Sequence, residues 1–112
     1  MKKTISILTP TYNEAENIEK LCLDISNEMK KMNYEYEHII IDNCSTDNTI
    51  PIIKKIAEKD KRVKIIINSR NFGAVRSPTY GIMQTSGDAV IYMNADFQDP
   101  VELIPKYIKR WE

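Results

Sequence analysis

The sequence contains few of the residues on which several common kinds of site depend. Its 112 residues include three glycines, two cysteines and one histidine. Cys22 and Cys44 lie far apart with no Cys-x-x-Cys spacing, so zinc and a structural disulfide are both unsupported and two free thiols are expected. The histidine, His38, precedes an apolar run, and no Ser-His-Asp or Cys-His set can be assembled around it. We expect His38 to be structural.

The chain also lacks a charge excess and a long apolar segment. Sixteen basic residues balance sixteen acidic ones, so no broad field favours nucleic acid or an anionic membrane surface. No apolar run approaches the roughly 18 residues that span a bilayer, and Pro10 interrupts the N-terminal stretch before a signal-peptide core can form. These features predict a cytoplasmic protein with no nucleic-acid partner, folded as one unit over residues 1–112.

Four short apolar runs, rich in β-branched residues, are the main structural signal of the sequence. Their nearly continuous apolar character is typical of strands buried on both faces of a parallel sheet. The runs are residues 5–8, 38–41, 63–67 and 89–93.

Amphipathic helical patterns alternate with these runs. Apolar residues recur on one stripe in three segments, residues 18–32, 52–57 and 103–111. A fourth helix is expected within residues 73–85, where it either starts at Ser77 and Pro78 or is kinked there. The alternation predicts an α/β fold of Rossmann-like type, with a mainly parallel sheet in the order 3-2-1-4 and helices on both faces. Polar loops then follow every strand at its carboxyl end, the edge where such sheets bind ligands.

The loop after the first run reads TPTYNE, and its residues Thr9, Pro10, Tyr12, Asn13 and Glu14 make a polar turn from strand to helix. Tyr12 can stack on a nucleobase, or it can be a tyrosine at the edge of the core. Asn13 can cap the following helix, which would make this loop only a rigid turn.

Asp42 ends the second run and precedes Asn43, Ser45 and Thr46. Ser45 or Thr46 is expected to cap the next helix. A carboxylate at a strand end can accept a hydrogen bond from a base N–H or a ribose hydroxyl. The competing interpretation is that Asp42 satisfies the amides of its own loop.

Arg70 follows the third run in the segment NSRNFG. Its planar guanidinium can contact a phosphate or a base, although a solvated surface arginine is the commoner case. Arg76 is a weaker candidate for the same role.

The segment MNADFQDP follows the fourth run and carries two acids, Asp96 and Asp99. Mg²⁺ and Mn²⁺ prefer carboxylate oxygens and share them with substrate phosphates, which makes Asp96 the candidate metal ligand. Asp99 can equally be the N-cap of the last helix, with Pro100 at its first position, and this second interpretation is favoured.

Taken together, four segments resemble the N-terminal half of a family 2 glycosyltransferase of the GT-A fold. They are ISILTPTYNEAENI, IIIDNCSTDNT, NSRNFG and SGDAVIYMNADFQDPVELI, in the family's order and spacing along essentially the whole chain. The ending DFQDPVELI is most similar to the subgroup that transfers sugars to polyprenyl phosphates or builds surface polysaccharides.

The resemblance implies inverting transfer of a sugar from a nucleotide-diphosphate sugar, with Mg²⁺ or Mn²⁺ as cofactor. It places nucleotide-sugar contacts at Thr9, Pro10, Tyr12, Glu14, Asp42, Arg70, Asn94 and Asp96. The family's Asp-x-Asp motif falls on residues 94–96, where an amide replaces the first acid, so Asp96 alone would supply the charge to the metal, with Gln98 and Asp99 as helpers.

The resemblance also implies that the catalytic base lies beyond residue 112, in an acceptor-binding half that this chain lacks. The last helical stripe runs to the end without a capping glycine. We therefore expect a donor-binding fragment that is inactive alone and belongs to a longer, membrane-associated protein acting on a polyprenyl phosphate or a glycan. Helix faces left uncovered by the missing half are expected to favour self-association.

Two other classes of protein compete with this interpretation. A noncatalytic, receiver-like α/β module would carry paired acids on the first strand, where this chain has Thr9 and Pro10. A sugar nucleotidyltransferase would have a glycine-rich pyrophosphate loop there, and none of the three glycines lies in that loop.

Overall fold

A computed structural model describes residues 3–70, 85–96 and 100–112 of the chain. Strands and helices alternate through residues 4–67, as the sequence predicts. The elements are β1 (Thr4–Thr11), α1 (Ile18–Lys30), β2 (Glu35–Asp42), α2 (Thr49–Lys59), β3 (Val63–Ile67), β4 (Ala89–Tyr92), the 3₁₀ turn η1 (Val101–Leu103) and α4 (Ile104–Trp111).

The four strands form one parallel sheet in the order β3-β2-β1-β4, which confirms the predicted topology. β1 and β2 pair along their whole length, from Thr4 opposite Glu35 to Thr11 opposite Asp42. β3 continues this register, with Ile67 opposite Asp42. The carboxyl ends of β1, β2 and β3 therefore lie level with one another at one edge of the sheet.

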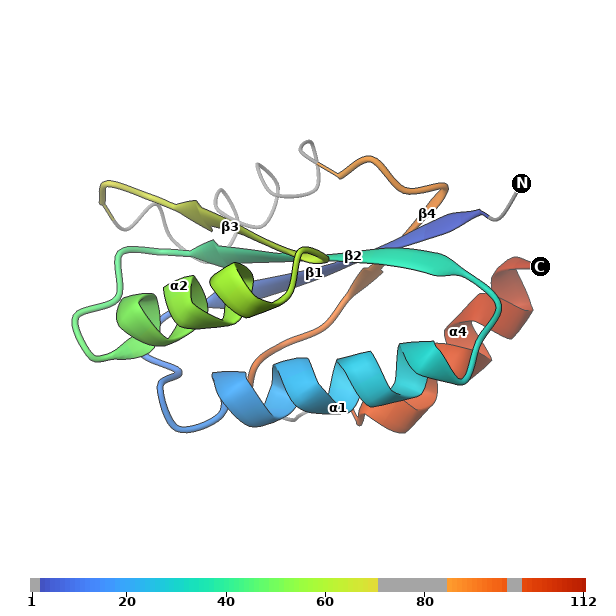
Figure 1. The fold of residues 1–112 in the computed structure, drawn as a ribbon, viewed down its shortest axis with the longest axis horizontal. Helices are drawn as coiled ribbons and strands as arrows, with labels where there is room; N and C mark the ends of the chain where they lie inside the picture. Colours follow the sequence, from blue (N-terminus) through green and yellow to red (C-terminus); the bar gives the residue numbers. More distant parts are fainter. Residues whose placement is uncertain (1–2, 71–84, 97–99) are drawn as a thin grey trace.

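All three described helices lie on the same side of this sheet (Figure 1). Their apolar stripes pack on the strands in one cluster that includes Ile7, Ile40 and Ile91 from the sheet. Neither α1 nor α2 has a side-chain hydrogen bond at its N-cap, so packing holds these helices in place. Each buried aliphatic side chain contributes roughly 1.5–3 kcal/mol to this packing. A smaller cluster of Leu8, Ile39 and Ile41 lies on the opposite face of the sheet.

Burial differs between the central and the outer strands. β1 and β2 are buried on both faces, as predicted. The prediction is wrong for β3 and β4, which expose part of their length. Val90 and Tyr92 are each 41% exposed. The physical reason is position, because β3 and β4 lie at the two ends of the strand order among the described residues.

The starts of the helices differ from those predicted. α1 begins at Ile18 after Asn17, so Asn13 is not its cap. α2 begins at Thr49 after Asn48, so neither Ser45 nor Thr46 caps it. The Asn13 side chain instead forms hydrogen bonds with Thr46 and Asp47 in the loop before α2.

The last helix also begins later than predicted. Pro100 has an extended backbone, with φ −62° and ψ 138°, and precedes η1 rather than occupying the first position of α4. The expected helix at 73–85, the candidate contact Arg76 and the roles of Gln98 and Asp99 fall outside the described residues. The sequence predicts helices on both faces of the sheet, and the helices that the structure describes cover one face.

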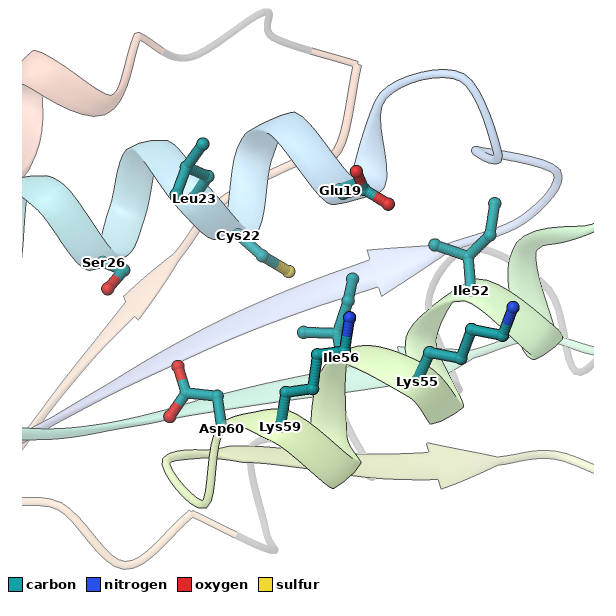
Figure 2. A pocket seen from close by; sticks show the side chains of 9 residues that line it. All are labelled: Glu19, Cys22, Leu23, Ser26, Ile52, Lys55, Ile56, Lys59 and Asp60. Atoms are coloured by element: carbon teal, nitrogen blue, oxygen red, sulfur yellow. The ribbon is translucent and has the colours of Figure 1, made fainter.

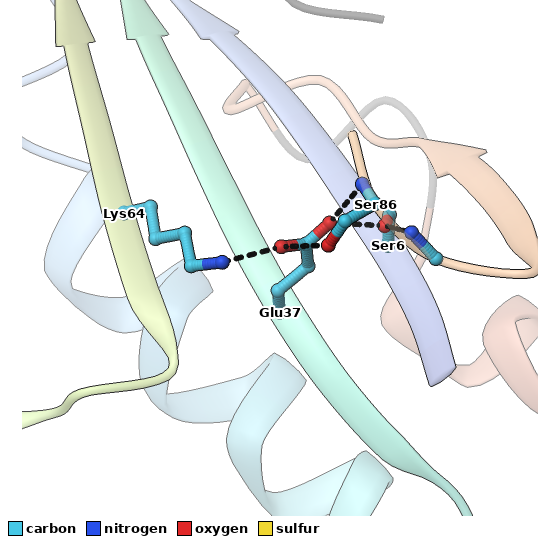
Figure 3. A network of polar contacts seen from close by, with 5 residues as sticks. Ser6, Glu37, Lys64 and Ser86 are labelled. Carbon is cyan, nitrogen blue, oxygen red and sulfur yellow. Dashed lines mark hydrogen bonds and ion pairs between the residues drawn. The ribbon is translucent and has the colours of Figure 1, made fainter. Parts of the chain in front are cut away.

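A buried carboxylate fixes the chain segment that leads into β4 (Figure 3). Glu37 accepts hydrogen bonds from the Ser6 hydroxyl, from Lys64 Nζ at 2.8 Å, and from the N–H and hydroxyl of Ser86 at 2.7 and 3.0 Å. Although desolvation favours the neutral acid, these bonds outweigh it and lower the pKa of Glu37 to about 2. Gly87 follows and donates its N–H to Ser6 Oγ at 2.8 Å. The network ties residues 86–87 across the starts of β1, β2 and β3.

Candidate functional site

The candidate site is the edge of the sheet where the strands end. Because every strand is parallel, the loops after β1, β2, β3 and β4 all leave from this edge. Met93 extends the pairing by donating its N–H to Leu8 O at 2.8 Å, and residues 94–96 follow. The structure thus brings all eight predicted site residues to one edge, from the last residues of β1 and β2 and from the loops that follow β1, β3 and β4.

Residues 9–14 differ in what they present at this edge. The Thr9 side chain is completely buried, and its hydroxyl lies 2.8 Å from His38 Nε2. That hydroxyl is therefore engaged inside the protein rather than displayed to a ligand. Pro10 and Glu14 are partly exposed, and Tyr12 is 47% exposed. Tyr12 thus offers the largest open aromatic surface of this loop.

His38 is a core residue, as the sequence predicts. Its side chain is 1% exposed, and burial lowers the pKa of the imidazole to about 4, despite a small opposing effect of the Asp60 charge. A neutral imidazole at physiological pH can share one hydrogen bond with Thr9 in either tautomer. His38 therefore supports β1 from β2 and is not a candidate for proton transfer.

Asp42 is fully buried, and its carboxylate already has three partners. Oδ1 accepts from the hydroxyls of Thr11 at 2.7 Å and Ser45 at 2.6 Å, and Oδ2 accepts from the Ser45 N–H at 2.8 Å. The structure therefore realises the competing interpretation, in which Asp42 satisfies donors of its own loops. An ionised carboxylate has about four acceptor positions, so one more hydrogen bond remains possible. A nucleoside contact through Asp42 stays a prediction.

The loops after β1 and β2 are joined by hydrogen bonds that sequence reasoning missed. Three consecutive backbone N–H groups, at 13–15, donate in turn to Ser45 Oγ at 2.9 Å, Thr49 Oγ1 at 2.9 Å and Asp47 Oδ2 at 3.3 Å. Although partial desolvation acts against it, hydrogen bonds from Thr49 and Ala15 hold the pKa of Asp47 below its usual range. A cluster of short polar side chains in both loops was the one signal available in the sequence.

The loop after β3 is tied to the loop after β2 as well. Asn68 donates its backbone N–H to Asp42 O at 2.9 Å and its side-chain amide to Asn43 Oδ1 at 3.3 Å. Cys44 Sγ lies 3.7 Å from Ser69 O. Arg70, the next residue, is exposed at the same edge. Three loops are therefore held together before any ligand arrives.

The segment after β4 displays oxygen atoms suited to a hard cation. Asn94 is half-buried, Ala95 is buried and Asp96 is exposed. Within residues 3–70, 85–96 and 100–112, no group of three or more histidine, cysteine or acidic side chains could hold a metal by itself. One carboxylate and one amide oxygen nevertheless fit Mg²⁺ or Mn²⁺, because such ions complete their shell with substrate phosphates and water.

A groove between α1 and α2 lies apart from these loops (Figure 2). Its lining contains none of the predicted site residues and includes Cys22, Leu23, Ile52, Ile56 and Lys59. Leu23 is 62% exposed, and burial raises the pKa of the Cys22 thiol to about 12. Both cysteines are free, as predicted. The groove is an uncovered helix face, and self-association through it stays a prediction.

A parallel sheet of this order, with polar loops collected at its carboxyl edge, places the chain in the class of open α/β folds that bind ligands at that edge. The family model described as Glycosyl transferase family 2 matches residues 6–112. The chain belongs to this family.

Individual relatives agree with this assignment. The chain is 40% identical over 108 residues to the "Putative glycosyltransferase CsbB" of Bacillus subtilis, covering 96% of this chain and 33% of that protein. It is 36% identical over 107 residues to the "Undecaprenyl-phosphate 4-deoxy-4-formamido-L-arabinose transferase" of Pseudomonas fluorescens, covering 95% of this chain and 31% of that protein.

A solved structure shows the same fold. The crystal structure of S. aureus TarS 1-349 in complex with UDP-GlcNAc superposes with a TM-score of 0.70 at 25% identity, covering 96% of this chain and 32% of that one. The chain thus spans about a third of the length of the proteins it matches. Among the residues that the structure describes, no helix combines the length and the apolar character needed to cross a bilayer.

Proposed function

We propose that this chain is the donor-binding part of an inverting glycosyltransferase that uses a nucleotide-diphosphate sugar. The observation that carries the proposal is the parallel order β3-β2-β1-β4, which brings the loops with Tyr12, Asp42, Arg70 and Asp96 to one edge of the sheet. Membership of glycosyltransferase family 2 supports a nucleotide-diphosphate sugar as the ligand at that edge.

Each loop has a distinct part in the proposal. The exposed ring of Tyr12 stacks on the nucleobase, and backbone groups near Thr9 and Pro10 line the same end of the ligand. Asp42 keeps its hydrogen bonds from Thr11 and Ser45 and accepts a fourth from the nucleoside, once other atoms that cover the buried carboxylate have moved aside. Glu14 lies beside this end, and the Arg70 guanidinium pairs with an oxygen or nitrogen edge of the nucleotide.

The diphosphate end belongs to the segment after β4. Asn94 and Asp96 would hold a Mg²⁺ or Mn²⁺ ion through an amide and a carboxylate oxygen. When bound, such an ion neutralises the negative charge that develops on a departing diphosphate. Asp96 is the only one of this pair with a charge, so metal affinity depends mainly on it.

The acceptor and the catalytic base belong to the rest of the protein in this proposal. A relative named as an undecaprenyl-phosphate transferase supports a polyprenyl phosphate as acceptor, with a growing polysaccharide as the alternative. A lipid acceptor implies that the full-length protein works at a membrane, with the donor site on the cytoplasmic side. By itself the 112-residue chain binds donor without transferring sugar.

Isothermal titration calorimetry of the chain with UDP and with GDP, each with and without Mn²⁺, tests donor binding. We expect one of the two nucleotides to bind, and to bind more tightly with Mn²⁺. Asp96→Ala should remove the metal-dependent gain. Asp24→Ala is the matched control, because Asp24 lies on α1, where its partly exposed carboxylate pairs with Lys20, and its loss removes the same charge.

A folded sample that binds neither nucleotide would refute donor binding by this chain. A metal-dependent gain that survives in Asp96→Ala would refute the assignment of Asp96 while leaving nucleotide binding intact. An equal loss in Asp24→Ala would show that net charge, rather than the segment after β4, governs the effect.

A further inference from the structure

We propose that Asn13 is a positioning residue for the nucleoside end of the site. The inference rests on the proposed function, because it assigns to Asn13 the task of holding Tyr12 and Asp42 in the arrangement that receives a nucleoside. Asn13 is not proposed to touch the ligand.

The side chain of Asn13 crosses from the loop after β1 to the loop after β2. Its Oδ1 accepts the backbone N–H groups of Thr46 at 2.8 Å and Asp47 at 3.2 Å. Its Nδ2 donates to Thr46 Oγ1 at 3.2 Å. One amide side chain therefore satisfies two consecutive backbone donors of the opposite loop, which fixes the distance between the loops.

The backbone of Asn13 extends this link to Asp42. Its N–H donates to Ser45 Oγ at 2.9 Å, and the same hydroxyl donates to Asp42 Oδ1 at 2.6 Å. A continuous path thus runs from Asn13 through Ser45 to the carboxylate. Tyr12 is bonded covalently to Asn13, so one residue influences both nucleoside-contact candidates.

The backbone conformation explains why asparagine suits this position. Asn13 has φ 55°, in the left-handed region, where glycine and asparagine are tolerated and most side chains are strained. Glycine would keep the turn but lose the bonds of the side chain. Aspartate would keep both the turn and an acceptor oxygen facing the N–H groups of Thr46 and Asp47. These two substitutions separate backbone shape from side-chain contact.

Within the described part of the chain, the hydrogen bonds of Asn13 reach the loop after β2 and do not reach the segment that carries Asp96. Loss of the Asn13 side chain should therefore weaken contacts to the nucleoside and leave contacts to the diphosphate unchanged. This difference distinguishes a positioning role from a general loss of stability. A loss of stability would weaken the apparent binding of every ligand in proportion to the fraction of unfolded chain.

The test measures binding of UDP, UMP and Mn²⁺-pyrophosphate by calorimetry, with GDP and GMP used instead if the wild-type chain selects guanine. We expect Asn13→Gly to weaken the binding of the nucleoside diphosphate and of the monophosphate by the same factor, roughly tenfold. This factor corresponds to the net free energy of about one hydrogen bond lost at the site. Pyrophosphate binding should stay unchanged. Asn13→Asp should lie within about twofold of wild type, because the acceptor is kept.

Two further variants keep the test decisive. Ser45→Ala breaks the path to Asp42 by a different route and should show the same nucleoside-selective loss if Asn13→Gly does not fold. Ile25→Val removes a methylene group from the core far from both loops. It should lower Tm without changing any binding constant at a temperature where the chain is folded.

Wild-type affinity for UMP in Asn13→Gly, or an equal loss for pyrophosphate, would overturn the inference while the proposed function stands. The same loss in Ile25→Val would also overturn it, because stability alone would then explain the effect. If the wild-type chain binds neither UDP nor GDP, the proposed function fails, and this inference fails with it.

Discussion

Protonation of His38 should destabilise the fold as the pH falls below neutrality. The imidazole is buried against Thr9, and burial lowers its pKa to about 4. An unfolded chain has an ordinary histidine with a pKa near 6.5. Between these two values the unfolded state binds the proton and the folded state does not. Stability is therefore fully present above pH 6.5 and is lost as the pH falls toward 4.

The size of the effect follows from the two pKa values. Between pH 7.5 and pH 5.0 the linkage relation gives a loss of about 2 kcal/mol in the free energy of unfolding, rising to about 3 kcal/mol below pH 4. The chain has a single histidine, so no other imidazole contributes. Carboxylates titrate mostly below pH 5, which keeps them outside the upper part of this window.

Urea unfolding followed by circular dichroism at pH 7.5, 6.0 and 5.0 measures this loss. His38→Gln removes the titrating group and should flatten the pH dependence, while its own stability at pH 7.5 is lower than that of wild type. An NMR titration of the His38 ring in the folded wild-type chain gives an independent value. Equal stability at pH 7.5 and 5.0, or a folded-state pKa near 6.5, would refute the reasoning.

Three further predictions concern the rest of the scaffold. Glu37→Gln should lower the free energy of unfolding by about 1–3 kcal/mol, because an amide cannot accept a hydrogen bond from every donor around it. Lys64→Met removes a partner of Glu37 whose side chain is 59% exposed, and it should lower the free energy of unfolding by no more than about 1 kcal/mol in the same urea assay. Gly87→Ala should lower the free energy of unfolding by about 1–3 kcal/mol, because the added Cβ would lie 2.7 and 2.9 Å from backbone atoms of β1. A variant with the same Tm as the wild-type chain would contradict this prediction. At pH 8 a thiol reagent should modify Cys44 quickly and Cys22 only after denaturation, because Cys22 is 8% exposed with a raised pKa. Two thiols reacting at equal rates in the native chain would refute that assignment.

The periodicity of the sequence was sufficient to predict most of the fold. Continuous β-branched runs and intervening apolar stripes encode strands and helices locally, because burial on both faces or on one stripe requires those patterns. The order of the loops also follows from this alternation, since parallel strands all end at the same edge. The predictions failed where a boundary depended on contacts, as at Pro100 and at the starts of α1 and α2.

The site shows the same division. Tyr12, Arg70 and Asp96 are exposed and lie in loops, where the sequence pattern placed them, and their contacts with a ligand stay predictions. The surroundings of Asp42 could not be predicted in the same way. Its partner Thr11 is 31 residues away, and whether that hydroxyl or a ligand meets the carboxylate depends on strand register.

By itself, the sequence determined the αβ alternation, the family and the loops that gather at the ligand edge. Only the tertiary structure decided that Thr9 faces His38, that Asn13 bridges two loops, and that Glu37 holds Ser86 from 49 residues away. The physical reason is that local patterns fix which side chains are buried. A hydrogen bond between distant residues exists only once the pairing register has brought its donor and acceptor within about 3 Å of each other.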